Sequence, residues 1–165
     1  MFFALFGHGG DKDASNIAVT PDMMNEVTKV EYRFGDRSVA PDYHRSYTIT
    51  ITDTEKAIAI ESYGDVLLTK QYTNTLADFQ AFKAELSTKG ITKHKEKDSG
   101  GCSGGTTETL RLYKGDEMLF DAYVYHCSGE SGTLSLPAGT ADLIRSQIPE
   151  SVRTLIESTM PNNRR

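Results

Sequence analysis

Hydrophobic and polar residues alternate along two stretches in the first third of the chain. In residues 46–53, Tyr47, Ile49 and Ile51 alternate with threonines, and residues 29–34 show the same period of two. Side chains of a strand point alternately to its two faces, so this pattern places one face against a core and the other in water. We therefore expect two antiparallel strands here.

Two further strands are predicted by residues 56–62 and 67–72, with a tight turn at residues 63–66 between them. Placing Gly64 at the first central position favours a type II′ turn, which requires a positive φ there. Residues 91–97 alternate three lysines with other polar residues. We interpret this segment as an edge strand whose lysines discourage pairing with other chains.

Helical spacing appears between the predicted strands and again near the C-terminus. The large apolar residues of the segment 76–86 recur at helical intervals, after Thr75 and before Gly90. These two residue types suit the start and the end of a helix. Shorter helices are predicted after Pro21 and on both sides of Pro149.

The second half of the chain repeats the first half in outline. Gly115-Asp116 lies between two strand patterns, as Gly64-Asp65 does, and a helical pattern follows in each half. This order predicts an α+β fold, in which a mainly antiparallel sheet carries helices packed on one face. It also favours a construction from two sequential strand-strand-helix units.

The chain of 165 residues has the length of one typical domain. We expect an N-terminal arm over residues 1–20, a single α+β domain over residues 21–160 and a tail over residues 161–165. The arm carries four large apolar side chains, Phe2, Phe3, Leu5 and Phe6. Apolar side chains at a chain end need cover, so this end is expected to dock on the domain or on a second copy, which would make the protein a homo-oligomer.

The composition argues against several kinds of partner. The formal net charge of −5 disfavours nucleic acid, whose binding needs a basic surface. No apolar run approaches the roughly 20 residues of a membrane-spanning helix, so no membrane partner is expected. We expect no cofactor, and we place the protein in the cytoplasm by default, or outside it if a leader precedes this sequence.

The densest glycine cluster surrounds Cys102, one of the two cysteines. Backbone amides of Gly101, Ser103 and Gly104 are candidates for holding a ligand, or for stabilising an oxyanion if Cys102 were a nucleophile. No catalytic signature accompanies the cysteine, which favours a structural role. A zinc site is not expected, because neighbouring residues of a strand such as His126 and Cys127 point to opposite faces.

Strand pairing predicts instead that the two cysteines, Cys102 and Cys127, are neighbours. If Gly115-Asp116 is a two-residue turn, a constant sum of paired residue numbers places Cys127 opposite Gly104. Cys102 then lies two residues away on the same face, at a diagonal distance slightly too long for a disulfide. A bulge in the glycine segment would bring the two sulfurs together, and we predict a disulfide under oxidising conditions.

Two hypotheses for function follow. The first is a non-enzymatic binding or structural module that engages a partner through a sheet face or the glycine loop. Tyr113, Tyr123 and Tyr125 near the cysteines would suit such recognition. The alternative is a small thiol-dependent enzyme or hydrolase that uses Cys102 with His94 or His44.

Overall fold

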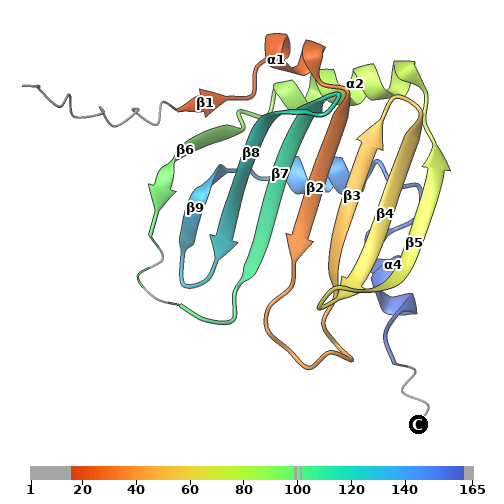
Figure 1. The fold of residues 1–165 in the computed structure, drawn as a ribbon, viewed down its shortest axis with the longest axis vertical. Helices are drawn as coiled ribbons and strands as arrows, with labels where there is room; N and C mark the ends of the chain where they lie inside the picture. The colour runs from red at the N-terminus through yellow and green to blue at the C-terminus, as the bar shows by residue number, and fades with distance from the viewer. Residues whose placement is uncertain (1–15, 99, 101, 162–165) are drawn as a thin grey trace, which may run out of the picture.

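The computed structural model describes residues 16–98, 100 and 102–161 of the chain. They form one nine-stranded antiparallel sheet with four short helices (Figure 1), so the prediction of an α+β fold with a mainly antiparallel sheet is confirmed. The order of strands across the sheet is β1-β6-β9-β8-β7-β2-β3-β4-β5. The strands are β1 (Ile17–Ala18), β2 (Lys29–Gly35), β3 (Ser46–Thr52), β4 (Glu55–Ser62), β5 (Asp65–Thr73), β6 (Thr92–Lys97), β7 (Thr106–Lys114), β8 (Glu117–His126) and β9 (Glu130–Ser135).

The first two helices each begin after a threonine whose side chain caps the first turn. In α1 (Pro21–Glu26), Thr20 accepts a hydrogen bond from the amide of Met23, and in α2 (Leu76–Ser87), Thr75 accepts one from the amide of Asp78. Such caps satisfy amides that the first helical turn leaves without partners. The last two helices are α3 (Thr140–Arg145) and α4 (Val152–Ser158). In Figure 1, α2 runs across one end of the strands and α4 lies near β4 and β5.

One hydrophobic core joins the sheet to the helices. In β3, Tyr47, Ile49 and Ile51 are buried while the threonines between them are partly exposed, as the alternation predicts. The same core takes side chains from all four helices. Its helical members are Met24 of α1 together with Phe79, Phe82, Leu86, Ile144, Val152 and Leu155.

The centre of the sheet joins the two halves of the chain. There β2 pairs with β7 over seven residues, from Lys29 opposite Tyr113 to Gly35 opposite Thr107. The strands β2 to β5 follow one another on one side, and β7 to β9 on the other. We predicted that β6 is an edge strand, and this is wrong. It pairs with β9 on one side, and on the other side β1 pairs with Thr92 and Lys93.

The hairpin between β4 and β5 has a different turn from the expected one. Ser62 pairs with Asp65, so Tyr63 and Gly64 are the two central residues, with φ of 49° and 96°. A positive φ at both positions is the requirement of a type I′ turn, not of type II′. Gly64 takes the second central position because the turn spans residues 62–65, one residue earlier than the predicted 63–66.

The start of the fold lies within the predicted arm. Strand β1 pairs with β6, and Val19 is buried in the core. Phe2, Phe3, Leu5 and Phe6 fall outside the described residues, as do the last four residues of the predicted tail. Within the described part of the chain, no helix is long and apolar enough to cross a membrane.

Candidate functional site

A disulfide joins the segment before β7 to the segment after β8. Cys102 and Cys127 are bonded, with 6.0 Å between their Cα atoms and a sequence separation of 25. The predicted proximity of the two cysteines is confirmed. The carbonyl oxygen of Ser103 lies 3.6 Å from Sγ of Cys127, and Gly101 falls outside the described residues.

The register that produces this proximity differs by one residue from the predicted one. Lys114 pairs with Glu117 as expected, but the register shifts next to Tyr113, so that Leu112 pairs with Phe120 and Thr106 with His126. A bulge at Leu119 absorbs the extra residue. Cys127 therefore lies beside Gly105 and not opposite Gly104 as predicted. The glycine segment in which we predicted a bulge precedes the first paired residue of β7, Thr106.

Gly105 leaves the space that the ring of Tyr125 occupies. A β-carbon at Gly105 would stand 2.3 Å from the carbonyl oxygen of His126 and 2.9 Å from ring carbon Cε2 of Tyr125. The amide of Gly105 also donates a 3.0 Å hydrogen bond to Oη of Tyr125. The tyrosine is thus held at its ring and at its hydroxyl, directly beside the disulfide.

Gly132 leaves space for the ring of Tyr123 in the same way. Tyr123 lies on β8, two residues before Tyr125. A β-carbon at Gly132 would stand 2.5 Å from the carbonyl oxygen of Tyr123 and 2.9 Å from its ring carbon Cε2. Gly132 also has φ of 101°, a value that side chains disfavour. The hydroxyl of Tyr123 donates a hydrogen bond to Oε1 of Glu96, and this bond, with a smaller effect of burial, raises the pKa of Tyr123.

The two tyrosines line a groove on the surface. We call it the tyrosine groove, and its cavity volume is about 240 Å³. Tyr123 is 37% exposed there. The lining residues are Glu96, Lys97, Asp98, Thr107, Tyr123, Tyr125 and Ser131.

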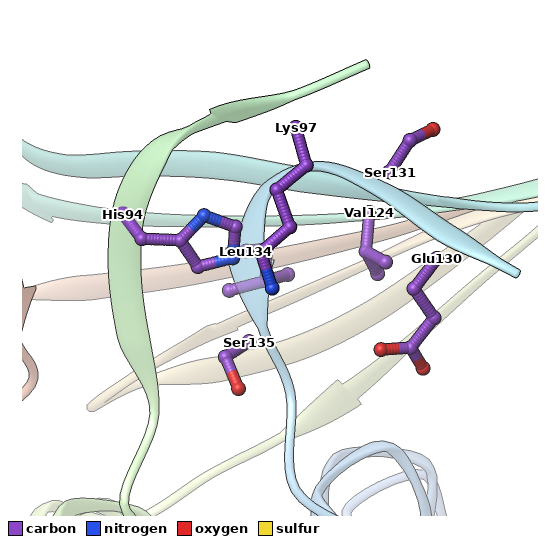
Figure 2. A pocket seen from close by; sticks show the side chains of 7 residues that line it. All are labelled: His94, Lys97, Val124, Glu130, Ser131, Leu134 and Ser135. Carbon is purple, nitrogen blue, oxygen red and sulfur yellow. The ribbon is translucent and has the colours of Figure 1, made fainter. Parts of the chain in front are cut away.

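The charges that face the tyrosine groove are mainly negative. Among the described residues, no lysine, arginine or histidine forms an ion pair with Glu96 or Asp98. Lys97 lines the groove as well, but Figure 2 shows its side chain running toward Leu134 and the neighbourhood of His94. The two carboxylates are therefore free to receive a cation.

A second, much smaller cavity lies where β6 and β9 part. These strands pair at Lys93 and again at Lys97, with an irregularity between the two positions. The cavity has a volume of about 30 Å³ and lies among His94, Glu130 and Leu134 (Figure 2). This is enough room for about one or two water molecules and far below the roughly 300 Å³ of a small-molecule site.

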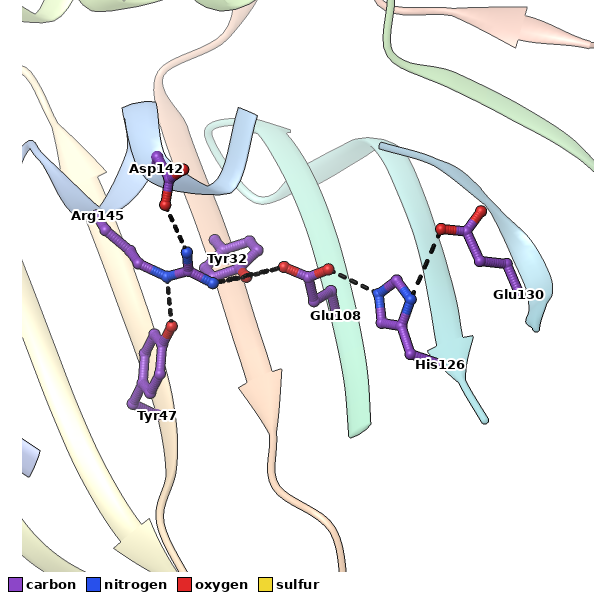
Figure 3. A network of polar contacts seen from close by, with 7 residues as sticks. All are labelled: Tyr32, Tyr47, Glu108, His126, Glu130, Asp142 and Arg145. Carbon is purple, nitrogen blue, oxygen red and sulfur yellow. Dashed lines mark hydrogen bonds and ion pairs between the residues drawn. The ribbon is translucent and has the colours of Figure 1, made fainter. Parts of the chain in front are cut away.

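A polar network crosses the buried face of the sheet beneath α3 (Figure 3). Arg145 of α3 donates to Oη of Tyr47 at 2.8 Å and to Oη of Tyr32 at 3.3 Å. Tyr32 in turn donates to Glu108, whose second carboxylate oxygen lies 2.8 Å from Nε2 of His126. Asp142 and Glu130 extend the network at its two ends.

The contacts of this network indicate a structural role. Burial raises the pKa of both Tyr32 and Tyr47, so these phenols stay protonated and do not act as bases at neutral pH. The guanidinium of Arg145 is occupied by Tyr47, Tyr32 and Asp142. The hydroxyl, guanidinium and carboxylate groups of this network thus bind one another, as buried polar groups generally do.

The sequence pattern did not predict this network, although it contains a signal for it. Glu108 occupies the same face of β7 as the buried Leu110 and Leu112, because all three have the same parity. A carboxylate at an inward position requires a partner. That partner, Arg145, is 37 residues away in sequence and can be identified only from the packing of α3.

The residues proposed for thiol chemistry are not brought together. The sulfur of Cys102 is in the disulfide, and His44 is buried near Ser46, where its ring stacks on Tyr63. His94 contacts the carbonyl oxygen of Lys95. Within the described residues, no group of three or more His, Cys, Asp or Glu side chains is placed to hold a metal ion.

Comparison of the chain with protein-family models, with curated proteins and with solved structures gave no match.

Proposed function

We propose that the protein is a small non-enzymatic binding module that recognises a segment of another protein at the tyrosine groove. The observation that carries this proposal is the fixed pair of tyrosines: the rings of Tyr123 and Tyr125 fill the spaces above Gly132 and Gly105. Their hydroxyl groups are held as well, by Glu96 and by the amide of Gly105.

Preorganised tyrosines favour recognition for an energetic reason. A tyrosine buries a large apolar ring in an interface and loses little conformational entropy, particularly when the free protein already fixes the ring. The disulfide limits the movement of the loop next to Tyr125 in the same way. The groove therefore needs little rearrangement to receive a partner.

The finer architecture fits this role. We propose that the helices pack on one face of the sheet and that the tyrosine groove opens on the other. This is supported by the parity of β2, where Val30 and Tyr32 are fully buried while Glu31 and Arg33 are partly exposed. Tyr123 and Tyr125 have the parity opposite to the buried Ala122 and Val124.

We further propose that residues 17–160, which add β1 and Val19 to the predicted range 21–160, form a single domain built from two related units. The support is topological, since β2 to β5 are followed by α2, and β7 to β9 are followed by α3. The units meet where β2 pairs with β7. If the units were separated, β2 and β7 would each become an edge strand without a partner.

The disulfide favours a compartment outside the reducing cytosol. Disulfides persist in oxidising environments and are rare where thiols are kept reduced. We propose that the protein is exported, and that the Cys102–Cys127 bond is intact where the protein works. In that state Cys102 offers no thiolate, so nothing in the arrangement favours the thiol enzyme over the binding module.

A selection from displayed random peptides tests this function. The oxidised full-length protein is the bait, and the selected peptides are titrated into ¹⁵N-labelled protein while amide shifts are recorded. We expect saturable shifts at Thr107, Tyr123, Tyr125 and Ser131. Selected peptides that shift only residues elsewhere, or a selection that yields no binding peptide, would contradict the proposal.

A further inference from the structure

We propose that the tyrosine groove receives an arginine side chain of the partner. This inference rests on the proposed function and specifies the chemistry that the groove recognises. It follows from the charges around the groove, from its aromatic walls and from the way both are held in place.

The carboxylates of Glu96 and Asp98 supply the first part of the argument. Both line the groove, and neither has an ion-pair partner among the described residues. Each is oriented by one neighbour, since Glu96 accepts from Tyr123 and Asp98 accepts from the amide of Gly100 at 3.3 Å. An oriented carboxylate without a cation is the complement of a guanidinium group.

Among the described residues, the neighbouring basic side chains do not supply this cation. Arg111 has the same parity on β7 as Thr107, which lines the groove, but Glu31 at 2.9 Å and Asp121 at 3.1 Å already neutralise it. The side chain of Lys97 runs toward Leu134 (Figure 2). A partner that brings a positive charge would therefore gain attraction without displacing an existing pair.

The aromatic walls distinguish arginine from a simple ammonium group. A guanidinium is planar, so it can stack on a tyrosine ring while its edge donates two hydrogen bonds to a carboxylate. Tyr123 offers its ring and also positions Glu96 through its hydroxyl. Ring and carboxylate are thus held at neighbouring points, which a planar cation can contact together.

The test uses N-acetyl-arginine amide and its neutral analogue N-acetyl-citrulline amide as probes. They are titrated into the oxidised full-length protein and followed by amide shifts of Tyr123, Tyr125 and Ser131. A ligand of this size with one well-placed group is expected to bind with a Kd of about 1–10 mM. Citrulline keeps the shape and loses the charge, so we expect binding to weaken about tenfold or more.

The variant Glu96→Gln provides the second arm, because it keeps the size of the side chain and removes its charge. We expect it to lose most of the preference for arginine over citrulline. Glu117→Gln, at an exposed position of the β7–β8 turn, is the matched control and should keep the preference.

Equal shifts with the two probes, no shifts with either, or an unchanged preference in Glu96→Gln would overturn the inference. The proposed function fails separately. If a peptide without arginine binds at the same residues, the groove is a binding site and only the arginine inference is wrong. If neither the arginine probe nor any selected peptide binds there, both are wrong.

Discussion

Ring carbon Cε2 of Tyr125 lies 2.9 Å from the position that a β-carbon at Gly105 would take, and the amide of Gly105 donates to the hydroxyl of the same tyrosine. A side chain at position 105 would therefore collide with the end of β8, about 20 residues away in sequence, at the carbonyl oxygen of His126 as well as at this ring. The contact between Gly105 and Tyr125 joins the segment before β7 to the end of β8, beside the Cys102–Cys127 disulfide.

Replacing Gly105 with alanine should destabilise the fold by about 1–3 kcal/mol, since overpacking forces neighbours to move. The new β-carbon would stand 2.3 Å from the carbonyl oxygen of His126, which is backbone and cannot move aside cheaply. Urea unfolding measures the change. Gly35→Ala is the control, because its β-carbon would make only ordinary contact with Thr107 at 3.4 Å; equal stability of the two variants would contradict the packing at Gly105.

Removing the disulfide should lower the free energy of unfolding by about 3 kcal/mol by the chain-entropy estimate for a loop of this length. The bond closes a loop with a sequence separation of 25 residues. Unfolding by urea with and without reductant gives the value for the native chain. The double variant Cys102→Ser/Cys127→Ser should match the reduced chain and show no response to reductant. A native chain that is indifferent to reductant would show that the bond contributes nothing.

The network beneath α3 should be sensitive to loss of its cation. Arg145→Met leaves Glu108 without its guanidinium neighbour, 3.7 Å away, in a half-buried position. We expect a loss of about 2–3 kcal/mol, because an uncompensated carboxylate away from water is costly. Arg153→Met serves as control, since the Arg153–Glu157 pair is exposed and should change stability by less than about 0.5 kcal/mol. Similar losses in the two variants would argue against a special role for Arg145.

The buried phenols predict a loss of stability at alkaline pH. Burial raises the pKa of Tyr32 in the folded state, whereas in the unfolded chain a tyrosine ionises near pH 10. Above this pH the unfolded state releases the proton and the folded state keeps it, so stability falls by about 1.4 kcal/mol per pH unit for each such group. Below about pH 10 both states keep the proton, so the full stabilisation by the buried phenol is present.

Urea unfolding between pH 8 and pH 11 checks this dependence. Tyr32→Phe removes one of the groups, so its stability should decline less steeply than that of the native chain above pH 10. The same slope in both proteins would mean that Tyr32 ionises as readily in the folded state as in the unfolded one.

Local patterns predicted the elements of this fold better than they predicted their pairing. Strand β3 follows directly from its alternation, and α2 from Thr75 and its apolar stripe, because each depends on neighbours in sequence. The predicted register between β7 and β8 differs from the observed one by one residue. It depends on a bulge at Leu119, within the run Met118-Leu119-Phe120, where no change in residue type marks the extra residue.

The candidate site was less accessible to sequence reasoning for the same reason. The cysteines and Tyr123 stood out by residue type, but Gly132 lies in a strand whose sequence, Glu-Ser-Gly-Thr-Leu-Ser, lacks a strong strand pattern. Its role depends on Val124 pairing with Gly132 across β8 and β9, which places the ring of Tyr123 over the glycine. Only the paired sheet shows that glycines and tyrosines form one unit.

The central claim is that the tyrosine groove is the binding site, and the affinity of one selected peptide for three proteins tests it most directly. Calorimetry on the oxidised native chain, on Tyr123→Ser and on Tyr43→Ser gives three dissociation constants. Tyr43 is the matched control because it is also a surface tyrosine, 55% exposed, and contributes nothing to the groove. Removal of a tyrosine at the centre of an interface typically costs at least about 1–2 kcal/mol, so we predict that Tyr123→Ser weakens binding about tenfold or more while Tyr43→Ser leaves it within about twofold. Unchanged affinity in Tyr123→Ser, or an equal loss in Tyr43→Ser, would contradict the account.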